Sequence, residues 1–377
     1  MNPAHVCTGR MYLPLPHVSY RLLHPLSPRG KLVYQGLEGL AMTHHMIEVA
    51  SVHQSNVQLR PELYRLASDD KTADQLQQVV ATAASSVLFG AEWFTREQLI
   101  EHEVVPLHDI SSAPSSLRGG LRLSKGCRVV HVPSYLQGLW KACLDLARKK
   151  KHCLEWKSAE DSSVLLKNND EHDDETTVVW CAGSGLWSSN LTFPTDLPVQ
   201  LVRGQSLELT IPMNNTTTAA LQHALLCGKY SSPLLQPNHV LIGATHEFIG
   251  LRHVDDDVPW WSCAKVYDEL SQRGAAVWPN NENTTVHRIT RGTRVQTARG
   301  NHGRLPMIGR LPTTNYPHDR HWIFTGLSSR GLLYHGLYGE RLARAVLAND
   351  EGLLSHGNDL WWKQAWERNQ RRDQTCK

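Results

Sequence analysis

A turn with glycine at both ends, near the C-terminus, is the stretch of this sequence best suited to chemistry. Four residues of strand-forming type, Trp322 to Thr325, precede Gly326, and apolar residues recur at helical spacing after Gly331. Glycine lets the backbone approach a ligand closely, because it has no Cβ. The unpaired N–H groups at the start of the following helix carry about half a positive charge. The turn could therefore hold an anion, or it could simply pack as a strand-turn-helix unit.

A second small-residue turn follows the apolar strand Thr177 to Cys181. The segment from Gly183 to Ser188 half-matches the dinucleotide-binding pattern GxGxxG, with Ser188 in the place of the third glycine. That pattern also needs an acidic residue about 20 positions further on, at the end of a second strand, and this residue is missing. The end of a packed strand is therefore as good an interpretation of this segment as a phosphate cradle.

Length and composition predict two domains and exclude several classes of protein. The 377 residues exceed the roughly 250–300 at which one hydrophobic core stops growing. The 39 basic and 36 acidic residues give a net charge of +3, so no global field favours nucleic acid or a membrane surface. Eight scattered cysteines form no CxxC pair and show no zinc-ligand spacing, so no metal site is predicted.

The cysteine pattern also indicates reduced thiols in an intracellular protein. No secretory signal peptide is visible, and no apolar run approaches the ~18 residues of a membrane helix. Before Glu38 the chain has no acidic residue and has Arg10, Arg21 and Arg29, as a transit peptide would. We therefore expect a cytoplasmic or organellar protein, with the mitochondrion or the plastid as the organelle.

Helices and strands alternate in the first half of the chain. Helical patterns are expected over 32–50, 71–88, 92–103, 134–146, 260–275 and 331–348. In the third of these, Thr95 is the expected N-cap and Gln98 completes a capping box, and Ser134 is the expected cap of the fourth. Strands are expected at 57–59, 63–66, 119–123, 129–133, 153–156, 177–181, 199–202, 206–211, 240–244 and 322–325. The strands from Pro198 onward fit a second, more antiparallel domain.

Taken together, these segments resemble the FAD-dependent amine and amino-acid oxidases of the D-amino-acid-oxidase and glycine-oxidase type. The resemblance extends to the C-terminal oxidase domain of the bacterial tRNA 5-methylaminomethyl-2-thiouridine enzyme. It covers roughly residues 20–348, and the last two motifs are the most specific. The matching segments, in the family's order, are Leu22 to Pro25, Gly119 to Trp140, Val178 to Gly183, Val202 to Gln205, Leu241 to Thr245, Leu305 to Gly309 and Gly326 to Leu332.

The resemblance implies an α/β protein with a Rossmann-like FAD/NAD(P)-binding domain and an α+β, mostly antiparallel substrate domain. It assigns residues 1–40, 125–190 and 288–377 to the FAD-binding domain, and 41–124 and 191–287 to the substrate domain. The implied reaction oxidises the C–N bond of an amino acid or related amine to an imine, with FAD as cofactor and oxygen as electron acceptor. A small-molecule amine is then the expected partner, and nucleic acid is not.

Two other functions remain open. One is a non-catalytic or truncated remnant of the fold that does not bind FAD. The other is a tRNA-modifying amine oxidase, which needs a basic docking face that the near-neutral composition does not reveal.

The resemblance also assigns roles to individual residues. Arg294, in the family's Gly-x-Arg position, would bind a substrate carboxylate, because its guanidinium stays charged and presents a planar fork; a surface arginine is the alternative. His246 and His24 would lie near the substrate or serve as structural histidines. The expected cofactor-binding residues are Tyr20, Arg21, Leu22, Gly183, Gly326, Leu327, Ser328, Ser329, Arg330, Gly331, Leu332 and Leu333.

The chain departs from the family pattern in three places. The flavin turn has Leu327 and Ser328 where the family usually has His or Gly, and an insertion from Asn301 to Arg304 replaces an acid before the Leu-Pro pair. Residues 1–19 contain neither a GxGxxG turn nor an acidic residue. We therefore expect the chain to lack its first FAD-binding βαβ unit, through truncation or a misplaced start, and to bind FAD weakly or not at all.

Overall fold

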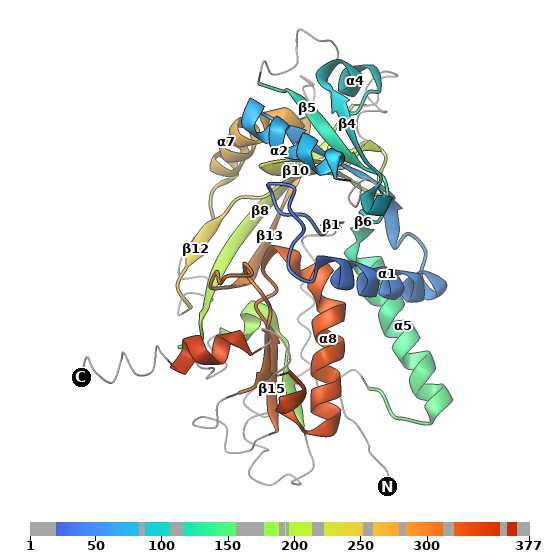
Figure 1. Cartoon of the computed structure of the whole chain (residues 1–377), viewed down its shortest axis with the longest axis vertical. Coiled ribbons are helices and arrows are strands. Elements are labelled where there is room, and N and C mark those ends of the chain that lie inside the picture. Colours follow the sequence, from blue (N-terminus) through green and yellow to red (C-terminus); the bar gives the residue numbers. More distant parts are fainter. Residues whose placement is uncertain are drawn as a thin grey trace, which may run out of the picture.

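The computed structural model describes most of the chain and places its elements in two layers of the molecule. The described residues are 20–82, 87–105, 116–155, 177–187, 193, 196–212, 222–251, 259–278, 284–311, 320–354 and 360–367. A large sheet with short helices fills the upper half of Figure 1, and a smaller sheet lies beside two long helices in the lower half. Residues 1–19, where the FAD-binding unit was expected to be missing, lie outside the described residues.

The lower sheet contains the predicted strand-turn-helix. Its order is β14 (Met307–Arg310), β15 (His321–Thr325) and β7 (Val178–Trp180), with β15 parallel to β7 and antiparallel to β14. Helix α8 (Gly331–Ala348) begins and ends where the sequence pattern predicts. Its residues Leu333, Leu337 and Leu342 are buried and pack in the core that contains Trp322. Their spacing puts one apolar face of the helix against the sheet.

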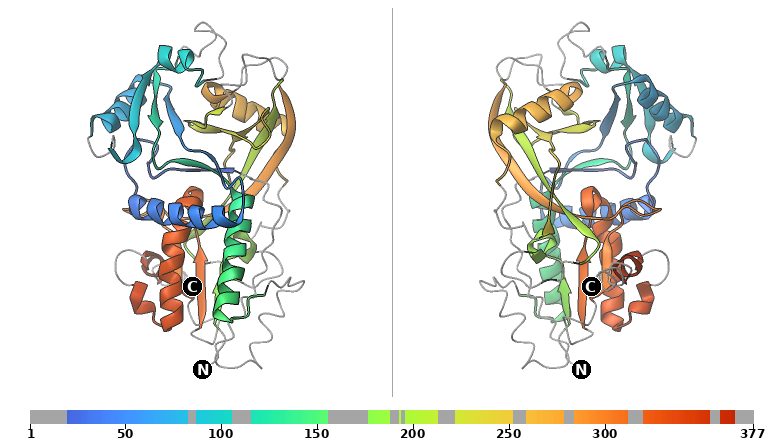
Figure 2. Two further views of the ribbon diagram at one scale, coloured as in Figure 1. Left: turned by 90° about the vertical axis from the view of Figure 1, so that its right-hand side faces the viewer. Right: turned by 90° about the vertical axis from the view of Figure 1, so that its left-hand side faces the viewer.

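Two further helices cross near α8. Helices α1 (Gly36–His53) and α5 (Val132–Lys150) contact each other, and α1 also contacts α8. The contacts are close because glycines lie at the crossings: a Cβ at Gly39 would lie 2.6 Å from the Leu333 carbonyl oxygen, and one at Gly138 would lie 2.4 Å from that of Ala50. In Figure 2, α5 and α8 stand on either side of β15, with α1 lying across them. A small antiparallel sheet, with the order β1-β6-β2, adjoins these helices. Its strands are β1 (Tyr20–Leu23), β6 (Arg128–His131) and β2 (Gln58–Arg60).

The upper sheet has nine strands among the described residues, in the order β12-β8-β11-β10-β9-β3-β5-β4, with β13 on the other edge of β8. All of its pairings are antiparallel except β3 with β9, so the predicted mostly antiparallel character is confirmed. Helices α2 (Asp70–Ala81), α4 (Arg96–Glu101) and α7 (Cys263–Arg273) lie against it (Figure 1). The strands are β3 (Leu63–Ala67), β4 (Ala91–Thr95), β5 (Gly119–Leu123), β8 (Val199–Thr210), β9 (Leu225–Cys227), β10 (Lys229–Pro233), β11 (His239–Gly243), β12 (Glu247–Ile249) and β13 (Thr285–Thr297).

The largest correction to the predicted elements concerns β8, which is one strand where two were expected. The expected strands left out residues 203–205, but Arg203 and Gln205 are each only 1% exposed and continue the pairing with β13. Arg203 is accommodated because its guanidinium stacks on the Trp260 ring at 4.7 Å. Strand β8 is therefore one continuous strand that carries a buried cation.

Five smaller corrections concern the ends of four helices and one expected strand. The predicted helix from 92 begins as strand β4, but the capping box is confirmed, since Thr95 and Gln98 bond each other's backbone N–H groups. Ser134 does not cap α5; it lies inside the helix and its hydroxyl contacts His131 Nδ1 at 2.7 Å. Helix α1 starts four residues later than predicted, and α2 ends at Ala81. Residues 153–155, expected as a strand, have no regular structure. None of the described helices is both long and apolar enough to cross a lipid bilayer.

Candidate active site

The turn between β15 and α8 holds the backbone in a shape that glycine permits. Gly326 has a φ of +71°, and a Cβ there would lie 2.4 Å from the Thr297 side chain. Residues Ser328–Arg330 form a short 3₁₀ helix that leads into α8. Gly331, by contrast, has a helical φ of −53°, and a Cβ there would make only ordinary contacts with Leu327. Gly326 is thus required by the fold, whereas protein contacts do not require glycine at Gly331.

The first turn of α8 is fixed from outside the helix. Thr43 on α1 donates a hydrogen bond from its hydroxyl to the Leu332 carbonyl at 2.8 Å. Tyr334 donates to the Tyr34 carbonyl at 2.7 Å. Arg330, the residue before the helix, supplies no side-chain cap to the first N–H groups. This end of an 18-residue helix therefore has a rigid position and a positive partial charge that an electronegative ligand atom could use.

His24 lies beside this turn, at the end of β1. Burial, together with the positive charges of Arg65 and Arg330, lowers the pKa of His24 to about 3. Arg65 is itself held in place by a 2.6 Å hydrogen bond to the Ser27 carbonyl. Because His24 is neutral at physiological pH, it adds no charge to the region, as expected of a structural histidine.

Strand β1 also carries three of the residues that the resemblance assigned to the cofactor. Leu22 is half-buried and packs on the main core, and β1 contacts α8. The side chains of Tyr20 and Arg21 lie outside the described part of the chain. Strand β1 therefore packs against the helix that follows the Gly326 turn.

Arg294 reaches the same region through β13. An isolated bridge pairs Gln296 with Leu327, so β13 runs from Arg294 directly to the turn. Two residues of strand span roughly 7 Å. The Arg294 guanidinium lies on the face that Gly204 leaves open: a Cβ on Gly204 would be 3.4 Å from its Nη2. The strand register thus positions the predicted carboxylate-binding arginine close to the predicted flavin turn.

His246 lies within electrostatic reach of Arg294. Removal from water, followed by the positive charges of Arg294 and Lys229, lowers the pKa of His246. Lys229 is buried and donates to the Ala244 carbonyl at 2.9 Å and to Glu269 at 3.1 Å. Glu269 therefore balances the charge of Lys229 beside His246.

Gly183 marks the other predicted turn. It follows β7, has a φ of +60°, and a Cβ there would meet no atom within 4 Å. A 3₁₀ helix, Gly183–Trp187, continues from it, and Ser188 lies outside the described residues. The end of β7 is therefore open enough for a ligand, although no second-strand acid accompanies it among the described residues.

Sequence reasoning missed Thr43 and Lys229. Thr43 is a polar residue on the buried face of a predicted helix, and that misplaced polarity is a signal that could have found it. Lys229 carries no comparable local signal, because its partners are 15 and 40 residues away.

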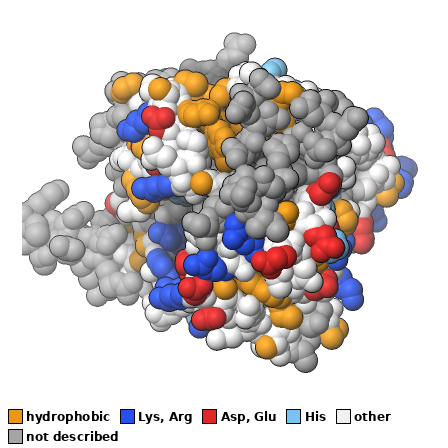
Figure 3. Space-filling model, turned by 90° about the horizontal axis from the view of Figure 1, so that it is seen from above, with side chains coloured by type: hydrophobic (Ala, Val, Ile, Leu, Met, Phe, Trp, Pro, Cys, Tyr) orange, Lys and Arg blue, Asp and Glu red, His pale blue; other side chains and the backbone are white. Residues whose placement is uncertain are grey.

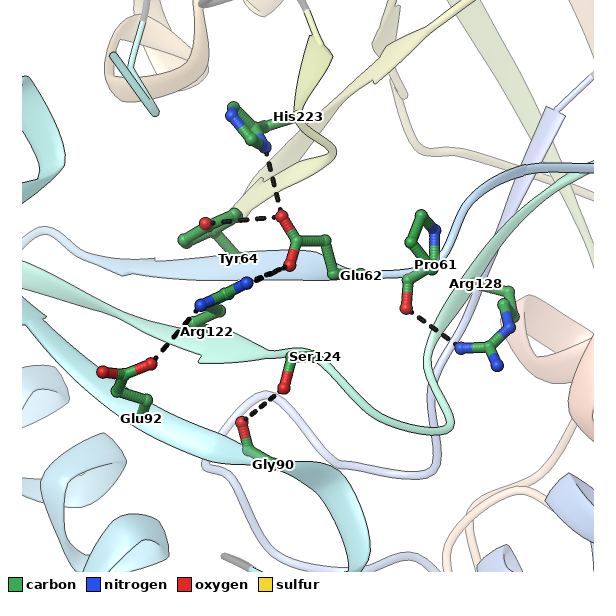
Figure 4. Close-up of polar contacts among 9 residues, drawn as sticks. All are labelled: Pro61, Glu62, Tyr64, Gly90, Glu92, Arg122, Ser124, Arg128 and His223. Atoms are coloured by element: carbon green, nitrogen blue, oxygen red, sulfur yellow. Dashed lines mark hydrogen bonds and ion pairs between the residues drawn. The ribbon is translucent and has the colours of Figure 1, made fainter. Parts of the chain in front are cut away.

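A polar network on the upper sheet was also missed, and Figure 4 shows how it is built. Glu62 pairs with Arg122 at 2.8 Å and lies 3.5 Å from both the Tyr64 hydroxyl and His223 Nδ1. Arg122 also reaches Glu92 at 3.5 Å. Burial raises the pKa of Tyr64 to about 12, so its hydroxyl stays protonated. This network joins two carboxylates to one guanidinium and braces neighbouring strands, as a structural cluster does.

Comparisons with known proteins identify a family and a fold. A family model described as DAO, FAD dependent oxidoreductase, matches residues 16–345. The glycine oxidase of Geobacillus kaustophilus is similar in structure, with a TM-score of 0.61 and 19% identity over 92% of this chain and 88% of that one. No curated protein sequence matches closely enough to be counted as a relative.

Two further solved structures share the fold. The iminodiacetate oxidase of Chelativorans sp. BNC1 has a TM-score of 0.60 and 15% identity over 89% of this chain and 86% of that one. The L-proline dehydrogenase of P. horikoshii has the same TM-score and identity over 88% of this chain and 86% of that one. Identities this low show the fold alone.

Proposed function

The chain belongs to the FAD-dependent oxidoreductases that the DAO model describes, and from that premise we propose that it oxidises the C–N bond of an amino acid or related amine to an imine. Oxygen is the proposed electron acceptor. The observation that carries the proposal is the Gln296–Leu327 bridge, because it aligns Arg294 with the Gly326 turn. The similar structures include oxidases named for glycine and for iminodiacetate, which are small amino acids.

The described residues fit the ring side of FAD. The room beside Gly331, the uncapped start of α8 and the open turn at Gly183 are the features that a bound dinucleotide could occupy. The backbone from Leu327 to Leu333 and the Gly183 turn would hold it. When bound, FAD would supply the hydride acceptor for the C–H bond next to nitrogen. This fit favours a flavoprotein over a remnant that has lost its cofactor site.

Arg294 and His246 have complementary proposed roles. The Arg294 guanidinium would orient a substrate through its carboxylate, since two parallel N–H groups match two carboxylate oxygens. His246, kept neutral by its surroundings, would accept a hydrogen bond from the substrate nitrogen without repelling a positive amine. Together the two residues select an amine that carries a carboxylate.

A tRNA substrate is less well supported. On the face shown in Figure 3, basic and acidic side chains lie intermixed among the described residues, with no extended basic surface. A docking face for RNA needs clustered Lys and Arg. A free amine or amino acid therefore remains the proposed substrate.

The proposal is tested by Arg294→Met with an amino acid and with the matching amine that lacks the carboxylate. Loss of a charge-assisted pair costs on the order of 2–4 kcal/mol, roughly 30-fold to 1000-fold in kcat/KM for the amino acid. The carboxylate-free amine should be little affected. Peroxide release and imine formation, measured on the FAD-loaded chain, report turnover.

Arg291→Met is the matched control, because Arg291 lies on the same strand and is exposed. It should leave both substrates unchanged. Equal losses for both substrates in Arg294→Met would remove the carboxylate role, and no oxidation of any amine by the FAD-loaded wild type would contradict the proposed function itself.

A further inference from the structure

Three metal-binding side chains meet on the upper sheet, at the opposite end of β13 from the Gln296–Leu327 bridge. They are Glu208 on β8, His239 at the start of β11 and His287 on β13, and one ligand atom of each lies within 4.8 Å of the others. We propose that this cluster binds one divalent transition-metal cation, with Zn²⁺ as the best match. The inference is independent of the proposed oxidase activity.

The strand register explains why the three residues meet. Glu208 pairs with Arg288 on β13, and Thr210 pairs with His239 on β11. The register of β13 shifts between Val286 and Arg288, so His287 is the extra residue of a β-bulge. A bulge redirects a side chain that regular pleating would place on the other face. His287 can therefore reach the side of the sheet where Glu208 and His239 lie.

Glu208 is a buried carboxylate, only 4% exposed, and its two oxygens have different partners. Arg288 Nε donates to Oε2 at 2.6 Å, which fixes the plane of the carboxylate. Oε1 faces His239 Nδ1 at 3.0 Å. Carboxylates that bind metals are usually held in place by a hydrogen bond from a residue that does not touch the metal. Arg288 has that position here, and it leaves the other oxygen of Glu208 facing the imidazoles.

His239 has the second contact that a metal-bound imidazole usually makes. Its Nε2 lies 3.3 Å from the Thr210 hydroxyl, which can accept the Nε2–H. In that tautomer the Nδ1 lone pair faces Glu208 Oε1, and the two electron-rich atoms repel each other. A cation bound by both atoms would remove this repulsion. Without a cation, His239 would instead carry its proton on Nδ1 and donate it to Glu208 Oε1. His287 would then have no role in the cluster.

The distances between the three ligand atoms suit Zn²⁺ once the His287 ring turns slightly inward. Zn–N and Zn–O bonds of roughly 2.0–2.2 Å put neighbouring tetrahedral ligand atoms about 3.4 Å apart. The Glu208–His239 pair, at 3.0 Å, is already near that separation. The rings of His239 and His287 have centroids 4.9 Å apart, and His287 is exposed, so its ring is free to turn inward. Two imidazoles favour a transition metal over Ca²⁺ or Mg²⁺, and water would take the fourth position.

The test uses Co²⁺ and Zn²⁺ on the full chain after treatment with a chelator. One equivalent of Co²⁺ should give the visible absorption bands of a tetrahedral site, and Zn²⁺ should abolish them by competition. His287→Ala should weaken Co²⁺ binding at least tenfold, and Thr210→Val roughly 10- to 100-fold through loss of the outer contact. Since the chain has 21 histidines, His45→Ala on α1, which is also exposed, serves as the control and should bind like the wild type.

His287 is exposed and unpaired in the strand ladder, so His287→Ala should keep the fold, which thermal unfolding of the metal-free variant checks. Saturable binding in the wild type that is lost in His287→Ala but kept in His45→Ala supports the site. Equal Co²⁺ uptake by all three proteins, or no tetrahedral spectrum in the wild type, overturns it.

Discussion

At the scale of single residues, positive charge organises the region around the flavin turn. Arg65 and Arg330 face His24, and Arg294 faces His246, and in both places the histidine is kept neutral. Burial is the larger cause of the lowered pKa at both histidines, and the basic groups add to it by repelling protons. The consequence is measurable as a dependence of stability on pH.

His24 should make the folded chain sensitive to acid. Its pKa is about 3 in the folded protein and about 6.5 when unfolded, so the unfolded state takes up a proton first as the pH falls. The free energy of unfolding therefore does not depend on His24 above its unfolded-state pKa and falls as the pH drops below that value. The fall between pH 7 and pH 5 is up to about 2 kcal/mol. His24→Gln should reduce that loss in urea unfolding at the two pH values.

His45→Gln provides the control, because His45 is exposed on α1 and should keep the wild-type difference. If His24→Gln loses as much stability between pH 7 and pH 5 as the wild type does, His24 is not held neutral by its surroundings.

At the scale of elements, the passage from β15 to α8 separates a glycine that the fold needs from one that a ligand would need. Gly326 adopts a positive φ against the Thr297 side chain. Gly331 is helical and has room for a Cβ. Gly331 therefore does not need the conformational freedom of glycine, and its proposed closeness to the cofactor remains testable.

Gly331→Ala should affect FAD binding, whereas Gly326→Ala should affect the stability of the fold. Gly331→Ala should unfold at or above the wild-type temperature, because alanine favours helix, and should bind FAD more weakly if backbone approaches the ring there. Gly326→Ala should lower the free energy of unfolding by roughly 1–3 kcal/mol through strain and crowding. Thermal unfolding and FAD titration of both variants decide the matter. Unchanged FAD affinity in Gly331→Ala would show that this turn is a packing element only.

At the scale of the whole molecule, β13 connects the upper sheet with the turn before α8. Strand β13 pairs with β8 over its length and then meets Leu327, while α1 packs on α5 and α8. The expected domain boundary at residue 40 lies inside α1. We therefore propose that α1 belongs with the FAD-binding part and that ligand binding at the turn stabilises both parts together.

FAD should bind beside the Gly326 turn and stabilise the fold. The room beside Gly331 and the start of α8 supply the ring side of a flavin site. Added FAD at about 100 times its Kd should therefore stabilise the chain by about 2.7 kcal/mol. Flavin absorbance measures the binding, and the unfolding temperature measures the stabilisation. No stabilisation at millimolar FAD contradicts the cofactor assignment.

The sequence alone determined the features that depend on neighbours along the chain. The turn at Gly326, the helix that ends at Ala348 and the capping box at Thr95 were all predictable, because glycine conformation, helical spacing and caps act over a few residues. The family resemblance supplied the roles of the turn residues and of Arg294. These predictions involve no strand register.

Only the tertiary structure decided which distant residues meet. The pairing of Gln296 with Leu327, the approach of Arg294 to His246 and the bulge that turns His287 toward Glu208 all depend on the register of β13. Register is fixed by long-range pairing and by burial on both faces of the sheet, and a shift of one residue would send every side chain to the opposite face. No local pattern encodes that choice, which is why the sequence showed candidate residues and the fold showed which of them form sites.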